Sequence, residues 1–94
     1  MLILAIRYYG TASGQVQGVG FRMFVQQHAS ELHITGWVKN MNDGTVTMEI
    51  QGEPEAVDKL EAIIREGNYF IKVQSFNLEE REPVADEKRF EIRY

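Results

Sequence analysis

The sequence predicts an α+β fold: a ferredoxin-like βαββαβ sandwich, an antiparallel sheet with two helices on one face and a short extra strand at the end. Strand and helix patterns follow one another in the order β-α-β-β-α-β before that last strand. A hairpin signal joins the two β-α-β units, and right-handed crossovers place both helices on the same face. A length of 94 residues suits a single core, so we expect one domain over residues 1–94.

The first half of the chain supplies a strand, a helix and a hairpin. Residues 2–9 (LILAIRYY) predict a strand that can extend to Ser13, with a bulge or bend at Gly10. Apolar side chains then recur at intervals of three and four, which predicts a helix: Phe21, Phe24, Val25, His28, Ala29 and Leu32. Two more strands are predicted over Thr35–Met41 and Thr45–Gln51, joined by the hairpin signal Asn42-Asp43-Gly44.

The second half supplies a helix and two strands. Residues 52–67 predict a helix with Pro54 in its first turn and Gly67 at its end. Its buried stripe is Val57, Leu60, Ile63 and Ile64. Tyr69–Leu78 predicts the fourth strand, Glu79–Lys88 a charged connection and Phe90–Tyr94 the last strand. We expect the aromatic side chains outside the helices to pack: Tyr8, Tyr9, Trp37, Tyr69 and Phe70.

Composition excludes several classes of function. The chain has no cysteine, so it has no disulfide, thiolate nucleophile or zinc–thiolate site, and this fits a cytoplasmic location. A net charge of −4 argues against a nucleic-acid partner. The opening MLILAI is short and is followed by Arg7, which argues against a signal peptide, and no run reaches the length of a membrane span.

A glycine-rich segment lies between the first predicted strand and the first predicted helix: Gln17-Gly18-Val19-Gly20-Phe21-Arg22. Glycines let successive N–H groups turn inward, and the helix that follows points its free N–H groups into the same space. Arg22 adds a permanent charge and a planar fork that matches two phosphate or carboxylate oxygens. The segment therefore predicts an anion site, although a common glycine-rich turn followed by a surface arginine remains an alternative.

The register of the hairpin places an amide near that segment. Val46, Met48 and Ile50 must face the helices, and a three-residue loop with Gly44 left-handed then pairs Asn40 with Val46. Asn40 would lie at the rim of the core on the side where the first helix begins, whereas a two-residue turn would reverse the faces. A carboxamide can position a water because it donates and accepts hydrogen bonds. The alternative is a strand-end residue that bonds its own backbone.

With these residues in view, the chain resembles the acylphosphatase family. "GQVQGVGFR" and "GWVKN" with "DGTV" match two family signatures, and "FEIRY" resembles its last strand, while "YYGTAS" departs from the expected first strand. The resemblance implies a single acylphosphatase-like domain that hydrolyses the carboxyl–phosphate bond of acyl phosphates. It implies that Arg22 and the backbone of residues 17–22 hold the phosphate while Asn40 orients the attacking water.

The chemistry of an acyl phosphate suits so small a set of groups. Its leaving carboxylate has a pKa of about 4 and departs as an anion, so no general acid is needed. The resemblance implies that a phosphate oxygen of the substrate takes the proton of the water. We therefore expect no cofactor and no metal, a monomer, and competitive inhibition by inorganic phosphate. His28 and His33 are expected to be structural.

Three other functions compete with this hypothesis. Acylphosphatase-like domains occur within larger maturation proteins that handle carbamoyl groups, a role that would need a partner here. An RNA-recognition domain shares the element order but carries aromatic residues on its third strand, where "TVTMEIQ" has none. A small-molecule regulatory module of the same fold would hydrolyse nothing.

Overall fold

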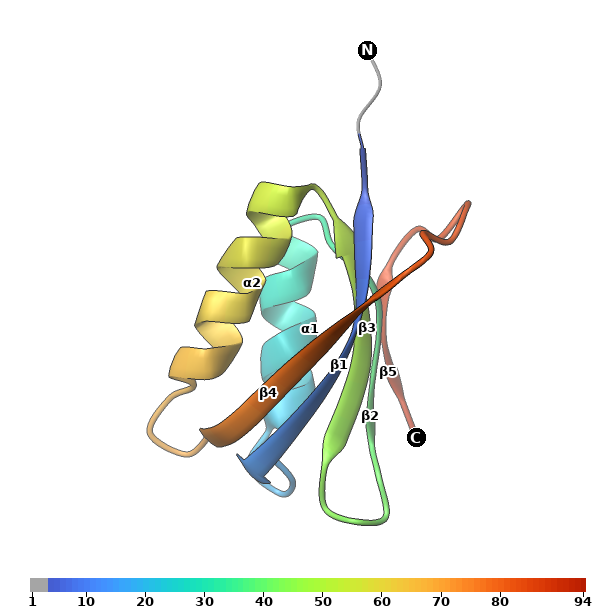
Figure 1. Cartoon of the computed structure of the whole chain (residues 1–94). Helices are drawn as coiled ribbons and strands as arrows, with labels where there is room; N and C mark the ends of the chain where they lie inside the picture. Colours follow the sequence, from blue (N-terminus) through green and yellow to red (C-terminus); the bar gives the residue numbers. More distant parts are fainter. Residues whose placement is uncertain (1–3) are drawn as a thin grey trace.

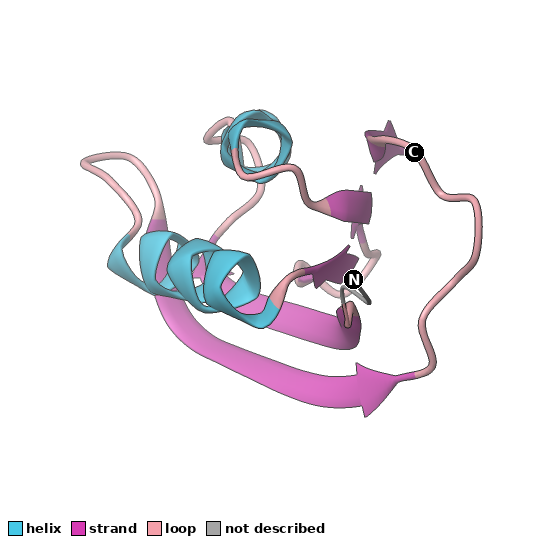
Figure 2. Ribbon diagram, turned by 90° about the horizontal axis from the view of Figure 1, so that it is seen from above, coloured by secondary structure: helices cyan, strands magenta, loops and turns pink. Residues whose placement is uncertain are grey.

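Both helices pack on one face of a five-stranded sheet. In a computed structural model, which describes residues 4–94, the elements are β1 (Ile6–Gln15), α1 (Phe21–Glu31), β2 (Thr35–Asn40), β3 (Val46–Gly52), α2 (Pro54–Glu66), β4 (Lys72–Arg81) and β5 (Phe90–Arg93). The strand order is β4-β1-β3-β2-β5. Figure 1 shows α1 and α2 side by side on the same face, and Figure 2 shows the β4–β5 connection passing on the other side. The predicted ferredoxin-like α+β fold is confirmed.

The four strands of the βαββαβ unit form the predicted antiparallel sheet, and the short extra strand, whose direction the sequence did not indicate, joins its edge in parallel. β5 pairs with β2 in parallel, with Gly36 opposite Phe90, whereas the other neighbouring strands are antiparallel. β4 and β5 lie at opposite edges of the sheet. The connection between them starts where β4 ends, which is the end of the sheet where β2 begins, so β5 must run in the same direction as β2.

The first strand lies later in the sequence than predicted. β1 begins at Ile6 and continues through Ser13 to Gln15; the expected first residues, Leu2 and Ile3, lie outside the described residues. Its register shifts between Ser13 and Gly14. β1 therefore leads directly into the glycine-rich segment.

Gly10 is not the site of a bulge or bend, contrary to the prediction. It pairs in register with Met48 on β3 and Leu78 on β4. A Cβ atom at this position would lie 2.8 Å from Cε1 of Phe76 and 3.1 Å from Cδ2 of Leu78. Glycine is needed here because the Phe76 ring packs against the backbone of β1.

Tyr69 and Phe70 do not pack in the core, so that expectation was wrong. β4 starts only at Lys72, and these two side chains lie in the preceding loop, 83% and 66% exposed. Asn68 Oδ1 accepts hydrogen bonds from the N–H groups of Phe70 and Ile71, both at 2.8 Å. This turn directs only Ile71 into the core. β4 also continues beyond Leu78 to Arg81, into the predicted charged connection, and β5 ends at Arg93.

The core fills the space between the helices and the sheet. Buried positions repeat along both helices at the predicted spacing: Phe21, Val25 and Ala29 on α1, and Val57, Leu60 and Ile64 on α2. On the opposite face, Tyr9 and Trp37 are half-buried and meet edge to face, with ring centroids 6.2 Å apart.

The predicted hairpin register is confirmed. Asn40 pairs with Val46 and Val38 pairs with Met48, and Gly44 has a φ of +92° in the turn. Val38 is buried on the helix-covered face. Because side chains alternate along a strand, Asn40 lies on that same face at the end of β2.

A buried arginine anchors the β4–β5 connection on the open face of the sheet. The side chain of Arg7 is 3% exposed, and its Nε donates to Glu49 Oε1 at 2.6 Å. Its Nη1 and Nη2 donate to the two carboxylate oxygens of Glu87 at 2.7 and 3.2 Å. Nη1 also donates to Gln51 Oε1, and Gln51 exchanges two hydrogen bonds with the backbone of Val84. This network fixes the connection just before it enters β5.

The two charges of this pair favour each other's ionised form. Burial by itself would lower the pKa of Arg7, but its hydrogen bonds and charge interactions with Glu87 and Glu49 outweigh burial and raise it. Burial would likewise raise the pKa of Glu87, yet the hydrogen bond and charge of Arg7 bring it below its usual value.

Replacing Glu87 should therefore weaken folding in a pH-dependent way. Because the folded pKa of Glu87 lies below that of the unfolded chain, the stabilisation is complete above about pH 4.3 and is lost as the pH falls through the folded value. We expect Glu87→Gln to lower the free energy of unfolding by about 2 kcal/mol at pH 7. Urea unfolding should show the same deficit at pH 7 and pH 5 and a smaller deficit at pH 3.

Glu82→Gln is the matched control for this measurement. Glu82 lies exposed on the same connection, beyond the end of β4, and its replacement should leave the free energy of unfolding nearly unchanged at each pH. A deficit for Glu87→Gln that stays constant from pH 7 to pH 3 would contradict the ion-pair explanation.

Candidate active site

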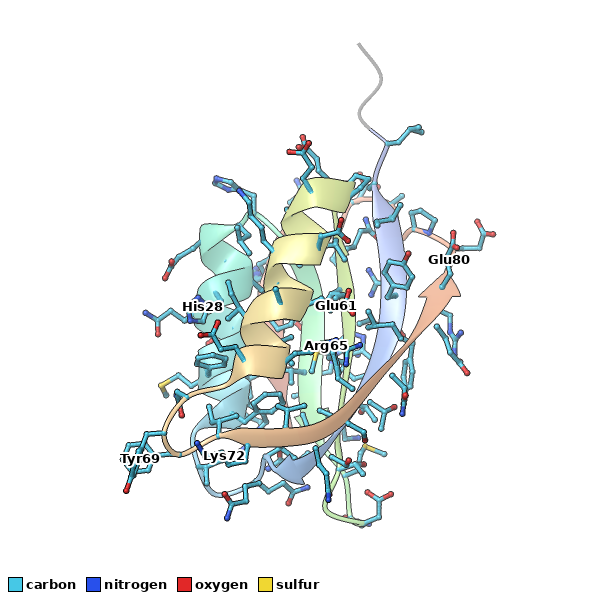
Figure 3. The ribbon with its side chains drawn as sticks, turned by 60° about the vertical axis from the view of Figure 1, so that its left-hand side comes forward. His28, Glu61, Arg65, Tyr69, Lys72 and Glu80 are labelled. Atoms are coloured by element: carbon cyan, nitrogen blue, oxygen red, sulfur yellow. The ribbon has the colours of Figure 1, made fainter. Side chains whose placement is uncertain are left out.

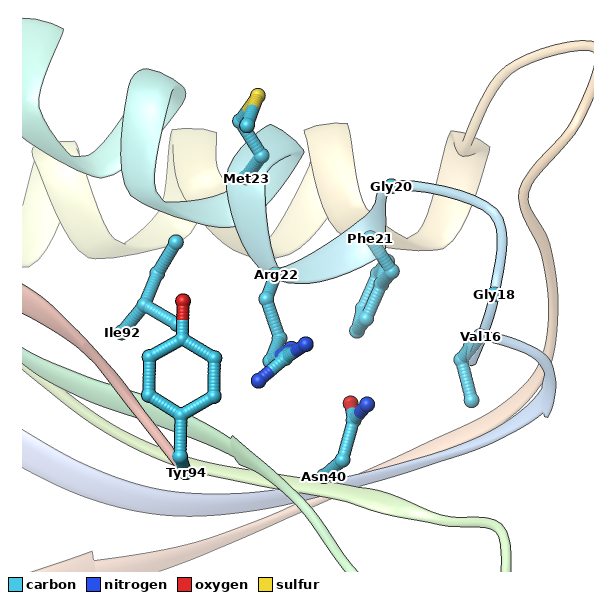
Figure 4. A pocket seen from close by; sticks show the side chains of 9 residues that line it. All are labelled: Val16, Gly18, Gly20, Phe21, Arg22, Met23, Asn40, Ile92 and Tyr94. Carbon is cyan, nitrogen blue, oxygen red and sulfur yellow. The ribbon is translucent and has the colours of Figure 1, made fainter.

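A pocket of about 200 Å³ opens where the β1–α1 loop meets the ends of β2 and β5. Figure 4 shows the side chains that line it: Val16, Gly18, Gly20, Phe21, Arg22, Met23, Asn40, Ile92 and Tyr94. Arg22 comes from the first turn of α1 and Asn40 from the last residue of β2. The structure therefore brings together the two side chains that the sequence singled out.

The backbone of the β1–α1 loop lines this pocket at Gly18 and Gly20. Gly18 and Gly20 have φ angles of +74° and +78°, whereas Val19 between them has a negative φ. Such alternation turns successive N–H groups toward one side and forms an anion-binding concavity. A Cβ atom at either glycine would meet no heavy atom within 4 Å. These positions thus require glycine for its backbone conformation and not for lack of space.

The first turn of α1 adds further free donors. Gly20 is the N-cap and supplies no capping side chain. Within residues 4–94, the N–H groups of residues 18–23 donate to no backbone acceptor. Helix N-termini carry a partial positive charge together with such unpaired N–H groups, so this end of α1 favours an anion.

Gln17 and Val19 belong to the predicted loop, but their side chains do not line the pocket. Gln17 Nε2 instead donates to the carbonyls of Met41 and Thr45 at 2.8 and 2.9 Å. It thereby ties the loop to the β2–β3 turn that follows Asn40. Val19 is half-buried and packs against the edge of the core.

Arg22 is held in place by the residues at the end of β5. Its Nη1 donates to the carbonyl oxygen of Arg93 at 3.3 Å, and its Cζ lies 4.8 Å from the centre of the Tyr94 ring. Sequence reasoning missed the contribution of Ile92, Arg93 and Tyr94. The pattern "FEIRY" indicated a strand, but it gave no information on which edge of the sheet that strand joins.

The carboxamide oxygen of Asn40 is buried and unpaired. Its Oδ1 has no hydrogen-bond partner among the described residues, and Figure 4 shows the carboxamide facing the guanidinium of Arg22 across the pocket. A buried acceptor without a partner costs about 1–3 kcal/mol. Asn40 is also one of the residues that line the pocket.

The two histidines lie away from the pocket. The ring of His28 meets that of Phe24 edge to face, with centroids 4.7 Å apart, and Figure 3 shows His28 on α1. His33 has a φ of +57° just after that helix. Over residues 4–94, no three His, Cys, Asp or Glu side chains gather as metal ligands. In the same range, no helix is both long enough and apolar enough to span a bilayer.

The comparisons with known proteins agree on one family. The family model for acylphosphatase matches residues 8–92. The curated acylphosphatase of Geobacillus thermodenitrificans is 48% identical over 88 residues, covering 94% of each chain. That of Clostridium acetobutylicum is also 48% identical over 89 residues, covering 94% of this chain and 97% of the relative.

Solved structures show the same likeness in three dimensions. The acylphosphatase from Bacillus subtilis superposes with a TM-score of 0.89 at 36% identity, covering 95% of this chain and 99% of that one. Full-length HypF in its phosphate- and nucleotide-bound form matches with a TM-score of 0.90 at 27% identity, and the match covers all of this chain but only 12% of that protein. With its sequence and its fold both matched over nearly their full length, the chain belongs to the acylphosphatase family.

Proposed function

We propose that this chain hydrolyses the carboxyl–phosphate bond of acyl phosphates, with its phosphate held by the β1–α1 loop and Arg22 and its water oriented by Asn40. Family membership and the names of the curated relatives support the acylphosphatase activity. One observation carries the assignment of roles: residues with free N–H groups, a guanidinium and an unpaired buried acceptor line a single pocket.

The loop and Arg22 supply the charge that a phosphoryl group requires. The N–H groups of residues 18–23 donate to the phosphoryl oxygens at the positive end of α1. Arg22 adds a full charge and two parallel donors. Its contacts with Arg93 and Tyr94 hold the guanidinium in place before substrate binds, so little reorganisation is needed during the reaction.

Asn40 supplies the position of the nucleophile. Oδ1 accepts a hydrogen bond from a water, which places the water oxygen in line with the bond to be broken. The new oxygen–phosphorus bond forms as the bond to the acyl oxygen breaks, and the carboxylate leaves as an anion. The proton of the water passes to a phosphate oxygen, and the products are a carboxylate and inorganic phosphate.

The competing functions have weaker support. HypF is 27% identical to this chain, whereas curated acylphosphatases reach 48%. The RNA-recognition and regulatory-module hypotheses gain nothing from these matches. We retain as parts of the proposal that the enzyme is a cytoplasmic monomer without a cofactor, a metal, or a nucleic-acid or membrane partner.

Removing the guanidinium should abolish both turnover and phosphate affinity. We expect Arg22→Ala to lower kcat/KM for benzoyl phosphate about 10³-fold, because the fixed charge is lost in both the ground state and the transition state. Arg22→Lys should recover only part of this loss, since it keeps the charge without the fork. Arg81→Ala, at an exposed arginine on β4 outside the pocket, is the control. An Arg22→Ala enzyme with more than a tenth of wild-type kcat/KM would refute this role.

Removing the carboxamide should impair turnover alone. We expect Asn40→Ala to lower kcat for benzoyl phosphate about 10²-fold, while the inhibition constant of inorganic phosphate stays within about threefold because Asn40 touches the water and not the phosphoryl oxygens. Steady-state kinetics measure both constants. Asn77→Ala, at an exposed asparagine on β4, controls for loss of an amide. Full activity of Asn40→Ala would show that the water is positioned by another group.

Inorganic phosphate should inhibit competitively, because it resembles the group that the loop and Arg22 hold. Initial rates at several phosphate concentrations should show KM rising while kcat stays constant. EDTA should leave the rate unchanged if the mechanism is metal-free. Non-competitive inhibition by phosphate, or inactivation by EDTA that added metal restores, would contradict the proposal.

A further inference from the structure

We propose that Arg93 is a positioning residue for the reaction: its side chain stacks on Trp37 on the open face of the sheet and thereby fixes the carbonyl oxygen that holds Arg22. This inference rests on the proposed function, because it concerns how the guanidinium that binds the phosphate is kept in place. Neither Arg93 nor Trp37 lines the pocket, so both act through Arg22.

The residues at the end of β5 alternate between the two faces of the sheet. Ile92 pairs with Val38, which is buried on the helix-covered face, and both Ile92 and Tyr94 line the pocket (Figure 4). Arg93 lies between them, so its side chain points to the open face. Its carbonyl oxygen accepts the hydrogen bond from Arg22 Nη1 at 3.3 Å. One residue therefore connects the pocket with the opposite face of the sheet.

The open face offers the side chain of Arg93 a firmly held partner. Its Cζ lies 4.9 Å from the centre of the Trp37 ring. A guanidinium within about 6 Å of an indole centroid is attracted to the face of the ring. Trp37 is half-buried on β2 and meets Tyr9 on β1 edge to face. Because β1 and β2 are both interior strands of the sheet, the ring is a rigid support.

The end of β5 has few other restraints. The strand has four residues, and β2 is its one neighbour among the strands of residues 4–94. On the pocket side, Tyr94 is 91% exposed, so it adds little buried surface. Short segments with few buried contacts open readily. The stack on Trp37 therefore restrains the Arg93 carbonyl, and through it the guanidinium of Arg22.

Arg93→Met tests this role, because it keeps the backbone carbonyl and an unbranched side chain but removes the guanidinium. We expect kcat/KM for benzoyl phosphate to fall about three- to tenfold and the inhibition constant of inorganic phosphate to rise by a similar factor. Arg93→Lys should recover most of the loss, since an ammonium is also attracted to the ring. A variant that only lost stability would contain less active enzyme, but its inhibition constant would stay unchanged.

Arg81→Met is the matched control. Arg81 lies opposite Arg7 on the other edge of the same face, and its Cζ lies 5.2 Å from the centre of the Tyr9 ring. The substitution therefore removes the same charge and the same kind of contact. Because no residue of β4 lines the pocket, both constants should stay at their wild-type values.

Trp37→Leu removes the partner of Arg93 and should produce the same two changes. Combined with Arg93→Met, it should cause no further loss, because both substitutions break one contact. Steady-state kinetics of the two single variants and the double variant measure this coupling.

A wild-type inhibition constant for phosphate in Arg93→Met would overturn this inference. Equal changes in Arg81→Met, or losses that add in the double variant, would also overturn it. In each case the wild type still hydrolyses benzoyl phosphate, so the proposed function stands. A wild type that hydrolyses no acyl phosphate would instead overturn the proposed function, and this inference with it.

Discussion

The proposed active site of this protein depends on hydrogen-bonding groups that the fold leaves unpaired at one point. Buried or inward-facing polar groups are nearly always satisfied within a folded protein, because an unmet donor or acceptor costs free energy. Here the N–H groups at the start of α1 and the Oδ1 of Asn40 have no acceptor or donor within the described chain. In the function that we propose, a phosphoryl group and a water supply the complementary groups.

The rest of the structure keeps these groups in place. Gln17 joins the loop to the β2–β3 turn, which fixes the distance between the N–H groups and the end of β2. Arg7 and its carboxylate partners fasten the β4–β5 connection to the sheet. That connection leads into β5, whose last residue supplies the carbonyl that holds Arg22. A polar network on the open face of the sheet thus supports a guanidinium on the other side.

The simplicity of the site follows from the reaction of the acylphosphatase family. A carboxylate is a stable leaving anion, so the enzyme needs neither an acid to protonate it nor a nucleophile to form an intermediate. What remains is to hold charge and to align a water. In the mechanism that we propose, backbone donors, one arginine and one amide perform these tasks, so a chain of 94 residues without cysteine suffices for it.

The sequence by itself determined the local features. The helices followed from the spacing of apolar residues, the hairpin register from the alternation of Val46, Met48 and Ile50 together with Gly44, and the candidates Arg22 and Asn40 from residue types at the ends of predicted elements. Each of these depends on neighbours a few residues apart along the chain or directly across a hairpin. Gly10 was misjudged because its requirement comes from the Phe76 ring on another strand.

Only the tertiary structure decided which distant segments meet. The parallel pairing of β5 with β2, the contact of Arg93 and Tyr94 with Arg22, and the partners of Arg7 all join residues more than 40 positions apart. Tyr69 and Phe70 were misjudged for a local reason: their apolar side chains suggested a strand, but a turn around Asn68 leaves them in solvent. Residue patterns indicate whether a segment forms a helix or a strand and which of its faces is buried. Which distant strand or side chain a segment contacts depends on how the whole chain packs. Several surfaces could bury the same segment, and only the complete fold selects one of them.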